Sequence, residues 1–173
     1  MHRYSWAALA IFVVLADQSS KFWIESEMTL GGSMFLTPFL NLVYVLNTGA
    51  AFSILAEANG WQKYIFIAIA SAVSVFLTLM LLKGKLKHHE QTCYSLLLGG
   101  AISNLLDRLS RGAVVDFIDL HVGFWHWPAF NIADSAIVLS VSALICSSLR
   151  GFKVSPKTGV QGDYVIERAF VEK

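Results

Sequence analysis

Two aspartates of this 173-residue sequence stand among apolar residues, with no lysine or arginine beside them. Asp116 lies in the segment VVDFIDLH, and Asp134 lies in the segment FNIADSAIV. Apolar surroundings raise the pKa of a carboxyl group, and two carboxyl groups that meet can share one proton. Such a pair can take a proton from water and protonate a carbonyl oxygen and a leaving amine, which is the acid–base chemistry that peptide hydrolysis needs.

Asparagine precedes two of the aspartates at helical spacing. Asn104 stands three residues before Asp107, and Asn131 stands three residues before Asp134. Side chains at i and i+3 share one face of a helix. An aspartate at the centre of a membrane helix costs about 2.5–3.5 kcal/mol on insertion scales, so polar faces of such helices point into the bundle. We therefore expect both motifs to face the interior of a helical bundle.

Two other carboxylates have a basic neighbour. Asp17 is followed by Lys21 at i+4, and Asp107 is followed directly by Arg108. A nearby cation favours the ionised carboxylate, so both pairs predict contacts that hold helices together. Asp107 stays a rival to Asp116 for a catalytic role, because it stands in the more regular Asn-x-x-Asp motif.

The composition is that of a membrane protein. Of all residues 55% are hydrophobic and only 14% are charged, and the mean hydropathy is +0.59, whereas ordinary soluble domains carry about 25% charged residues. The 13 Lys and Arg against 12 Asp and Glu leave no basic excess. Intrinsic disorder and nucleic-acid binding are therefore both excluded.

Apolar runs with few charges predict four membrane helices, over residues 5–23, 61–82, 92–110 and 129–149, since a span needs roughly 20 mainly apolar residues. The first run begins like a cleaved signal peptide, but no clear A-x-A cleavage site precedes Asp17, so we expect it to be retained. The uncharged run 28–56 contains turn formers beside aromatic and β-branched residues, which predicts extended structure at the membrane surface. Within it, the stretch 48–60 is a candidate lid with Gly49 and Gly60 as hinges.

The predicted fold is an all-α membrane bundle of four transmembrane helices with a small extracytoplasmic β-rich element and a short amphipathic lid. Residues 1–153 form a single integral-membrane domain, and residues 154–173 form a mobile cytoplasmic tail. Placing both termini and the loop 83–91 on one side gathers most of the 13 Lys and Arg there, which makes that side cytoplasmic. Most of the acidic residues then lie toward the outer face, where we expect the chemistry.

The connection between the third and fourth helices decides whether Asp116 and Asp134 can meet. Gly112 is a plausible end for the third helix, and Pro128 is an accepted first-turn residue for the fourth. The loop 113–127 between them ends in aromatic residues that favour the membrane interface. Proximity of the two aspartates is therefore possible, but spacing alone does not prove it.

Five blocks in order, within residues 14–149, carry a resemblance to a known family: DQSSK (17–21), NTGAAF (47–52), GGAISNLLDR (99–108), GAVVDF (112–117) and PAFNIADS (128–135). With four spans of this length, the sequence resembles lipoprotein signal peptidase, also called signal peptidase II. One departure is Ser103, where the family usually has glycine before the asparagine. Serine is still small enough for close helix contact.

The resemblance implies an aspartic endopeptidase of the bacterial plasma (inner) membrane. It implies removal of the signal peptide from diacylglyceryl-modified prolipoproteins, by a cut on the N-terminal side of the lipidated cysteine, with membrane lipid around the site and globomycin-type inhibitors binding in it. It implies no metal or other cofactor, and an oligomer is not required. Carried over residue by residue, the catalytic pair is Asp116 and Asp134. The implied substrate-binding residues are Asn47, Asn104, Arg108 and Asn131, and the implied supporting residues are Asp17, Lys21, Asp107 and Gly49.

Other functions fit the residues less well. A small ion- or proton-coupled carrier or channel subunit would also use buried aspartates, but nearer the bilayer midplane, and a purely structural subunit leaves the acids unexplained. His121 and His126 do not form a H-E-x-x-H zinc motif. Ser103 and Ser135 lack a nearby Lys or His base and a G-x-S-x-G motif.

Overall fold

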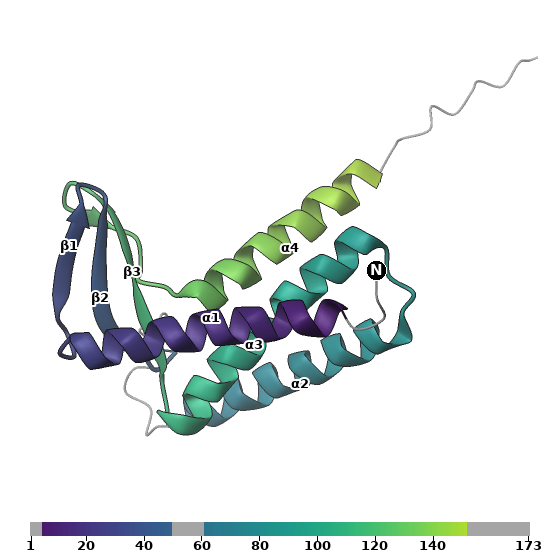
Figure 1. The fold of residues 1–173 in the computed structure, drawn as a ribbon, viewed down its shortest axis with the longest axis horizontal. Coiled ribbons are helices and arrows are strands. Elements are labelled where there is room, and N and C mark those ends of the chain that lie inside the picture. Colours follow the sequence, from purple (N-terminus) through teal and green to yellow (C-terminus); the bar gives the residue numbers. More distant parts are fainter. Residues whose placement is uncertain (1–4, 50–60, 152–173) are drawn as a thin grey trace, which may run out of the picture.

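The structure is a computed structural model that describes residues 5–49 and 61–151. Its helices are α1 (Ser5–Glu27), α2 (Gln62–Lys83), α3 (His88–Ser110) and α4 (Ile132–Gly151). Its strands are β1 (Ser33–Thr37), β2 (Leu40–Asn47), β3 (Val114–Val122) and β4 (Trp125–His126), in the spatial order β1-β2-β3-β4. The sheet stands at one end of the helices, where α1 ends and α4 begins (Figure 1). The predicted tail 154–173 and all but the first two residues of the predicted lid 48–60 lie outside the described residues.

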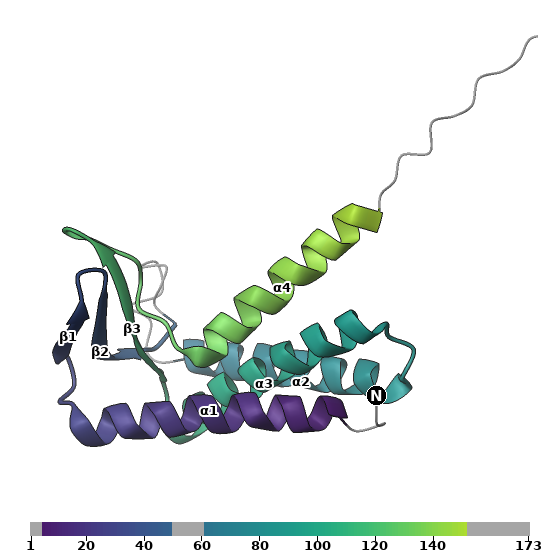
Figure 2. The ribbon, with the colours of Figure 1, turned by 45° about the horizontal axis from the view of Figure 1, so that its top comes forward.

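Three of the helices are long and apolar enough to cross a membrane: Ser5–Glu27, Lys63–Lys83 and Ile132–Leu149. The chain is therefore a helical membrane protein with a small antiparallel sheet, as predicted. The more polar α3 packs against each of the other three helices and contributes many of the buried polar residues. In both views α4 diverges from the other helices as it leaves the sheet (Figures 1 and 2).

Two adjacent glycines let α3 approach its neighbours closely. A Cβ added to Gly99 would lie 2.7 Å from the backbone oxygen of Ala10 in α1, and one added to Gly100 would lie 2.6 Å from that of Ala133 in α4. Real Cβ atoms are essentially never found so close to such an atom, so any larger residue would push the helices apart. These two glycines therefore set the distances of α1 and α4 from α3.

The segment between α3 and α4 is a strand and a hairpin, where the sequence predicted a loop. Gly112 ends α3 at φ 78°, as predicted, and the β-branched run that follows pairs as β3 with β2. The fourth helix begins at Ile132 rather than near residue 129. Two interactions prevent an earlier start: Phe130 pairs with Ile118 of β3, and the Asn131 side chain accepts the backbone N–H of Asp134 at 2.8 Å.

The register of the sheet decides which residues reach the bundle. β2 and β3 are antiparallel, with Val45 opposite Asp116 and Asn47 opposite Val114. At the base of β3, Val115 and Phe117 pack with Ile24 of α1 in a buried apolar cluster. This cluster fixes the first half of β3 against the helices, beside the start of α4.

Candidate active site

Asp116 lies near the start of β3 and is 2% exposed. Its Oδ2 accepts a hydrogen bond from Nδ2 of Asn47 at 2.9 Å, and its Oδ1 accepts one from Nδ2 of Asn131 at 2.7 Å. The pKa of Asp116 is raised to about 6: burial is the largest cause, the nearby Asp134 adds to it, and the two amide donors act in the opposite direction. At neutral pH this carboxylate is mainly ionised and can take up a proton.

Asp134 lies in the first turn of α4, within reach of α3. Its Oδ1 accepts a hydrogen bond from Nδ2 of Asn104 at 2.7 Å, and its backbone N–H donates to Oδ1 of Asn131 at 2.8 Å. Asn131 therefore contacts both aspartates, Asp116 through its amide nitrogen and Asp134 through its amide oxygen. The structure thus brings together the two aspartates whose proximity the sequence left open.

The hydrogen bonds that their oxygens accept determine how the side-chain amides of Asn47, Asn104 and Asn131 are oriented. Oδ1 of Asn131 receives the backbone N–H of Asp134, and Oδ1 of Asn47 receives that of Gly49 at 2.8 Å. Oδ1 of Asn104 receives the ammonium of Lys21 at 3.1 Å. Each NH₂ group is consequently left to face a carboxylate, so the three amides act as donors to the aspartates.

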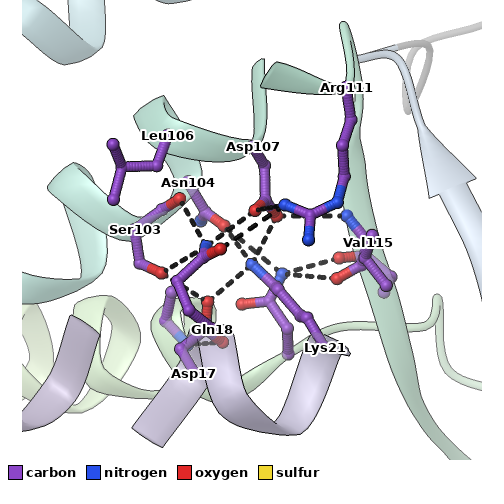
Figure 3. A network of polar contacts seen from close by, with 12 residues as sticks. Asp17, Gln18, Lys21, Ser103, Asn104, Leu106, Asp107, Arg111 and Val115 are labelled. Atoms are coloured by element: carbon purple, nitrogen blue, oxygen red, sulfur yellow. Dashed lines mark hydrogen bonds and ion pairs between the residues drawn. The ribbon is translucent and has the colours of Figure 1, made fainter. Parts of the chain in front are cut away.

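Lys21 is the centre of a buried network of charges (Figure 3). Its Nζ lies 2.6 Å from Oδ2 of Asp17 and 2.7 Å from Oδ2 of Asp107, and all three side chains are completely buried. Asp17 also accepts the hydroxyl of Ser103 at 2.7 Å and the backbone N–H of Ala133 at 2.8 Å. The network joins α1, α3 and the start of α4, so it supports the helix that carries Asp134.

The cation that pairs with Asp107 is not the neighbouring Arg108 that the sequence suggested. Asp107 contacts Lys21 and, at 2.9 Å, Nη1 of Arg111, which is one helical turn further along α3. Arg111 also forms two hydrogen bonds of 2.7 Å to Glu25 of α1. Both oxygens of Asp107 are thus engaged by cations, whereas those of Asp116 accept hydrogen bonds from amides.

Arg108 was expected to pair with its sequence neighbour Asp107, but it makes other contacts. Its Nη1 donates to the backbone oxygen of Asn104 at 3.1 Å, and its guanidinium carbon lies 5.2 Å from the ring centroid of Phe66 in α2. Among the residues implied to bind substrate, the three asparagines contact the aspartates directly, whereas Arg108 contacts the backbone of one of them.

Two members of the network, Gln18 and Arg111, were not predicted from the sequence. Nε2 of Gln18 donates to Oδ1 of Asp107 at 2.7 Å and to Oγ of Ser103 at 2.9 Å. The i, i+4 spacing of Asp107 and Arg111 was a usable signal, but no spacing indicates that a glutamine in α1 reaches across to α3. Ser103 fits its place because its hydroxyl joins this network.

Asp119 provides a contrast on the same strand as Asp116. It accepts a hydrogen bond from Nδ2 of Asn41 at 2.9 Å, and its Oδ1 lies 2.9 Å from Nδ1 of His126. Burial acts to raise its pKa, but the contacts with His126 and Asn41 outweigh burial and the pKa is lowered. Within residues 5–49 and 61–151, no group of three His, Cys, Asp or Glu side chains could hold a metal ion.

A largely apolar groove of about 380 Å³ opens beside Asp134, between the sheet and α4. Its lining residues are Leu120, Trp127, Phe130, Asp134, Ser135, Val138 and Leu139. The groove places apolar surface next to a carboxylate, which suits a ligand with an apolar part and a polar bond to be processed. The fold and the site together define a helical membrane protein in which two carboxylates accept hydrogen bonds from asparagine amides. Both carboxylates lie where the helices meet the sheet.

Comparison with known proteins identifies the family. A family model described as signal peptidase (SPase) II matches residues 9–150. The lipoprotein signal peptidase of Yersinia enterocolitica is 47% identical over 141 residues, which is 81% of this chain and 83% of that protein. That of Serratia marcescens is 44% identical over 159 residues, covering 92% and 93%. A bacterial membrane enzyme solved at 2.3 Å by the in meso method superimposes with a TM-score of 0.76 at 33% identity, covering 91% of this chain and 94% of the other.

The chain belongs to the signal peptidase II family and is an aspartic endopeptidase of this type. The resemblance stated from the five sequence blocks is therefore confirmed. Membership in a peptidase family sets aside the alternative of an ion- or proton-coupled carrier.

Proposed function

We propose that this enzyme removes the signal peptide from diacylglyceryl-modified prolipoproteins, by a cut on the N-terminal side of the lipidated cysteine. The relatives' name, lipoprotein signal peptidase, supports this substrate class. The observation that carries the chemistry is the contact of Asn131 with both Asp116 and Asp134.

We assign the base role to Asp116 and the acid role to Asp134. Both oxygens of Asp116 accept an amide N–H, which favours the ionised form. Oδ1 of Asp134 accepts the amide of Asn104, but its Oδ2 accepts no hydrogen bond from the residues that the structure describes, so this oxygen can carry the shared proton. The two carboxyl groups titrate as a pair.

The proposed reaction needs only water and these two groups. Asp116 takes a proton from water as the water oxygen attacks the carbonyl carbon, and Asp134 gives its proton to the carbonyl oxygen. In the second step the C–N bond breaks, the leaving nitrogen takes the proton from Asp116, and the hydroxyl proton returns to Asp134. Both carboxyl groups end in their starting state.

The remaining implied residues act on position. Asn47, Asn104 and Asn131 hold the carboxylates and are near enough to contact the substrate backbone. The buried pairs of Lys21 with Asp17 and Asp107 keep Asn104 and the start of α4 in place. Gly49, at φ 91°, donates its backbone N–H to Oδ1 of Asn47 and so supports the amide of Asn47. We also propose that Gly49 is a hinge of a lid formed by the stretch 48–60.

The membrane setting follows from the substrate. A lipid-bearing protein does not leave the bilayer easily, since each buried CH₂ contributes about 0.8 kcal/mol. The enzyme must therefore work at the lipid.

We propose that α3 is a fourth span, packed at the centre of the other three helices, in the bacterial inner membrane. Both termini would be cytoplasmic and the site would lie at the outer face. The apolar groove beside Asp134 would receive an apolar part of the substrate or of a globomycin-type inhibitor, and a monomer would suffice.

Purified enzyme incubated with matched lipidated and unlipidated precursors tests this proposal. We expect a shortened product from the lipidated precursor and little from the unlipidated one, with globomycin preventing its appearance. Equal cleavage of both precursors would contradict the assigned substrate class. If neither precursor is cleaved, the result would contradict the peptidase reaction.

A further inference from the structure

The end of the sheet that points away from the bundle is formed by two turns lying side by side. Leu40 of β2 pairs with Leu120 of β3, and the backbone N–H of His121 donates to the backbone oxygen of Phe39 at 3.0 Å. The turn between β1 and β2 therefore lies next to the turn between β3 and β4. We call this end the sheet tip; it comprises Pro38, Phe39, Val122, Gly123, Phe124, Trp125 and Trp127.

The sheet tip exposes large apolar side chains. Phe124 is fully exposed, Val122 is 76% exposed, and Phe39, Trp125 and Trp127 are each more than half exposed. The sequence has no Asp, Glu, Lys or Arg from 28 to 56 or from 120 to 133. An exposed apolar patch without charge marks an interaction surface rather than a surface in contact with water.

The nearest acidic group, Asp119, does not interrupt this surface. It is 7% exposed and its carboxylate contacts Asn41 and His126. His126 in turn stacks on His121 with the ring centroids 5.0 Å apart. The Asp119 carboxylate therefore lies at the base of the sheet tip, where Asn41 and His126 satisfy it.

The sheet tip is continuous with the lipid-facing side of α4. In both views the tip and α4 extend to the same side of the remaining helices (Figures 1 and 2). The groove between them is lined by Leu120 and Trp127 from the sheet and by Val138 and Leu139 from α4. Val138 and Leu139 are exposed on a helix that is apolar enough to span the membrane, so lipid is the neighbour of one wall of this groove.

From this continuity we propose that the sheet tip inserts into the bilayer leaflet beside α4, with Phe124 as its most deeply buried side chain. Aromatic rings, tryptophan above all, favour the boundary between headgroups and acyl chains, and the tip presents Trp125 and Trp127 there. The tip thereby anchors the far end of β3, the strand that carries Asp116. This interaction concerns where the molecule meets lipid and stands independently of the peptidase reaction.

Fluorescence quenching in vesicles tests the insertion. The full chain with Cys93→Ser and Cys146→Ser receives one new cysteine, Phe124→Cys at the tip or Glu27→Cys at the exposed end of α1 as the matched control. Each is labelled with an environment-sensitive fluorophore and reconstituted in phosphatidylcholine–phosphatidylglycerol vesicles. Quenching is measured with lipids brominated on their acyl chains and with aqueous iodide.

We expect the label at residue 124 to be quenched several-fold more by brominated lipid than the label at residue 27, and the reverse order with iodide. Strong iodide quenching at both positions, with no effect of brominated lipid at residue 124, would mean that the tip lies in water and would overturn the proposal. Protection of residue 124 from both quenchers would mean that a protein surface, such as a second copy of the chain, covers the tip, and would overturn it equally.

Discussion

Asn131 donates a 2.7 Å hydrogen bond from Nδ2 to Oδ1 of Asp116. The same side chain accepts the backbone N–H of Asp134. One residue therefore caps α4 and donates a hydrogen bond to a carboxylate on β3. The start of the helix and the position of the strand are therefore coupled. Any change that shifts the cap also shifts one aspartate relative to the other.

The activity of the enzyme should depend on pH through Asp116. Its pKa is raised to about 6, so below that pH the base is protonated and the rate should fall about tenfold per pH unit. Asn47→Ala removes a donor that lowers this pKa, and its acidic limb should therefore move to higher pH. A pH profile of kcat/KM for both enzymes measures the shift.

Asn41→Ala is the matched control for that profile. Asn41 also lies on β2 and also donates to an aspartate, but to Asp119 instead of Asp116. Its profile should coincide with that of the unsubstituted enzyme. An acidic limb that moves in the Asn41 variant and stays in place in the Asn47 variant would contradict the role of Asp116.

Asp107→Asn should impair folding more than chemistry. The carboxylate is completely buried between Lys21 and Arg111, and removing one partner of a buried ion pair destabilises by about 3–5 kcal/mol. Glu25→Gln, which breaks the more exposed pair with Arg111, should cost about 1 kcal/mol or less. Unfolding of the purified variants in detergent compares the two. A fully stable Asp107→Asn enzyme without activity would instead make Asp107 the catalytic rival.

Gly100→Ala should reduce kcat by moving the start of α4. Its Cβ would lie 2.6 Å from the backbone oxygen of Ala133, next to Asp134, and a displacement of about 1 Å at a reacting group can lower a rate about 100-fold. Gly99→Ala, which presses on Ala10 of α1 instead, should lower stability with a smaller effect on kcat. Parallel measurements of kcat and thermal unfolding separate the two effects. A smaller loss of kcat in the Gly100 variant than in the Gly99 variant would contradict the expected displacement of Asp134.

The sequence indicated which helix faces point into the bundle, but not the partners that their polar side chains contact. Both Asn-x-x-Asp motifs were expected to face the interior of the bundle, and there Asn104 donates to Asp134 and Asn131 donates to Asp116. These contacts join different elements, and periodicity describes only one helix at a time. The apolar setting of Asp116, by contrast, was readable from its neighbours in sequence and agrees with its burial on β3.

The elements that sequence reasoning placed least well are those set by tertiary contacts. A helix start at Pro128 is locally acceptable, yet Phe130 is drawn into pairing with Ile118 and delays α4 to Ile132. β3 escaped prediction because the β-branched and aromatic run after Gly112 is compatible with an interfacial loop as well as with a strand. The strand is decided by its pairing with β2, which lies about seventy residues earlier in the chain.

Cleavage of a lipidated precursor by Asp116→Asn and Asp134→Asn enzymes tests whether these two aspartates form the catalytic pair. Asp119→Asn is the control, because Asp119 is a buried carboxylate that belongs to a different cluster on the strand that carries Asp116. We expect the Asp116 and Asp134 variants to insert and fold but to lose about 10²–10⁴-fold in kcat, because an amide keeps the shape and cannot exchange the proton. The Asp119 variant should keep its activity. Full cleavage by either the Asp116 or the Asp134 variant would remove that residue from the catalytic pair and contradict the two-carboxylate reaction.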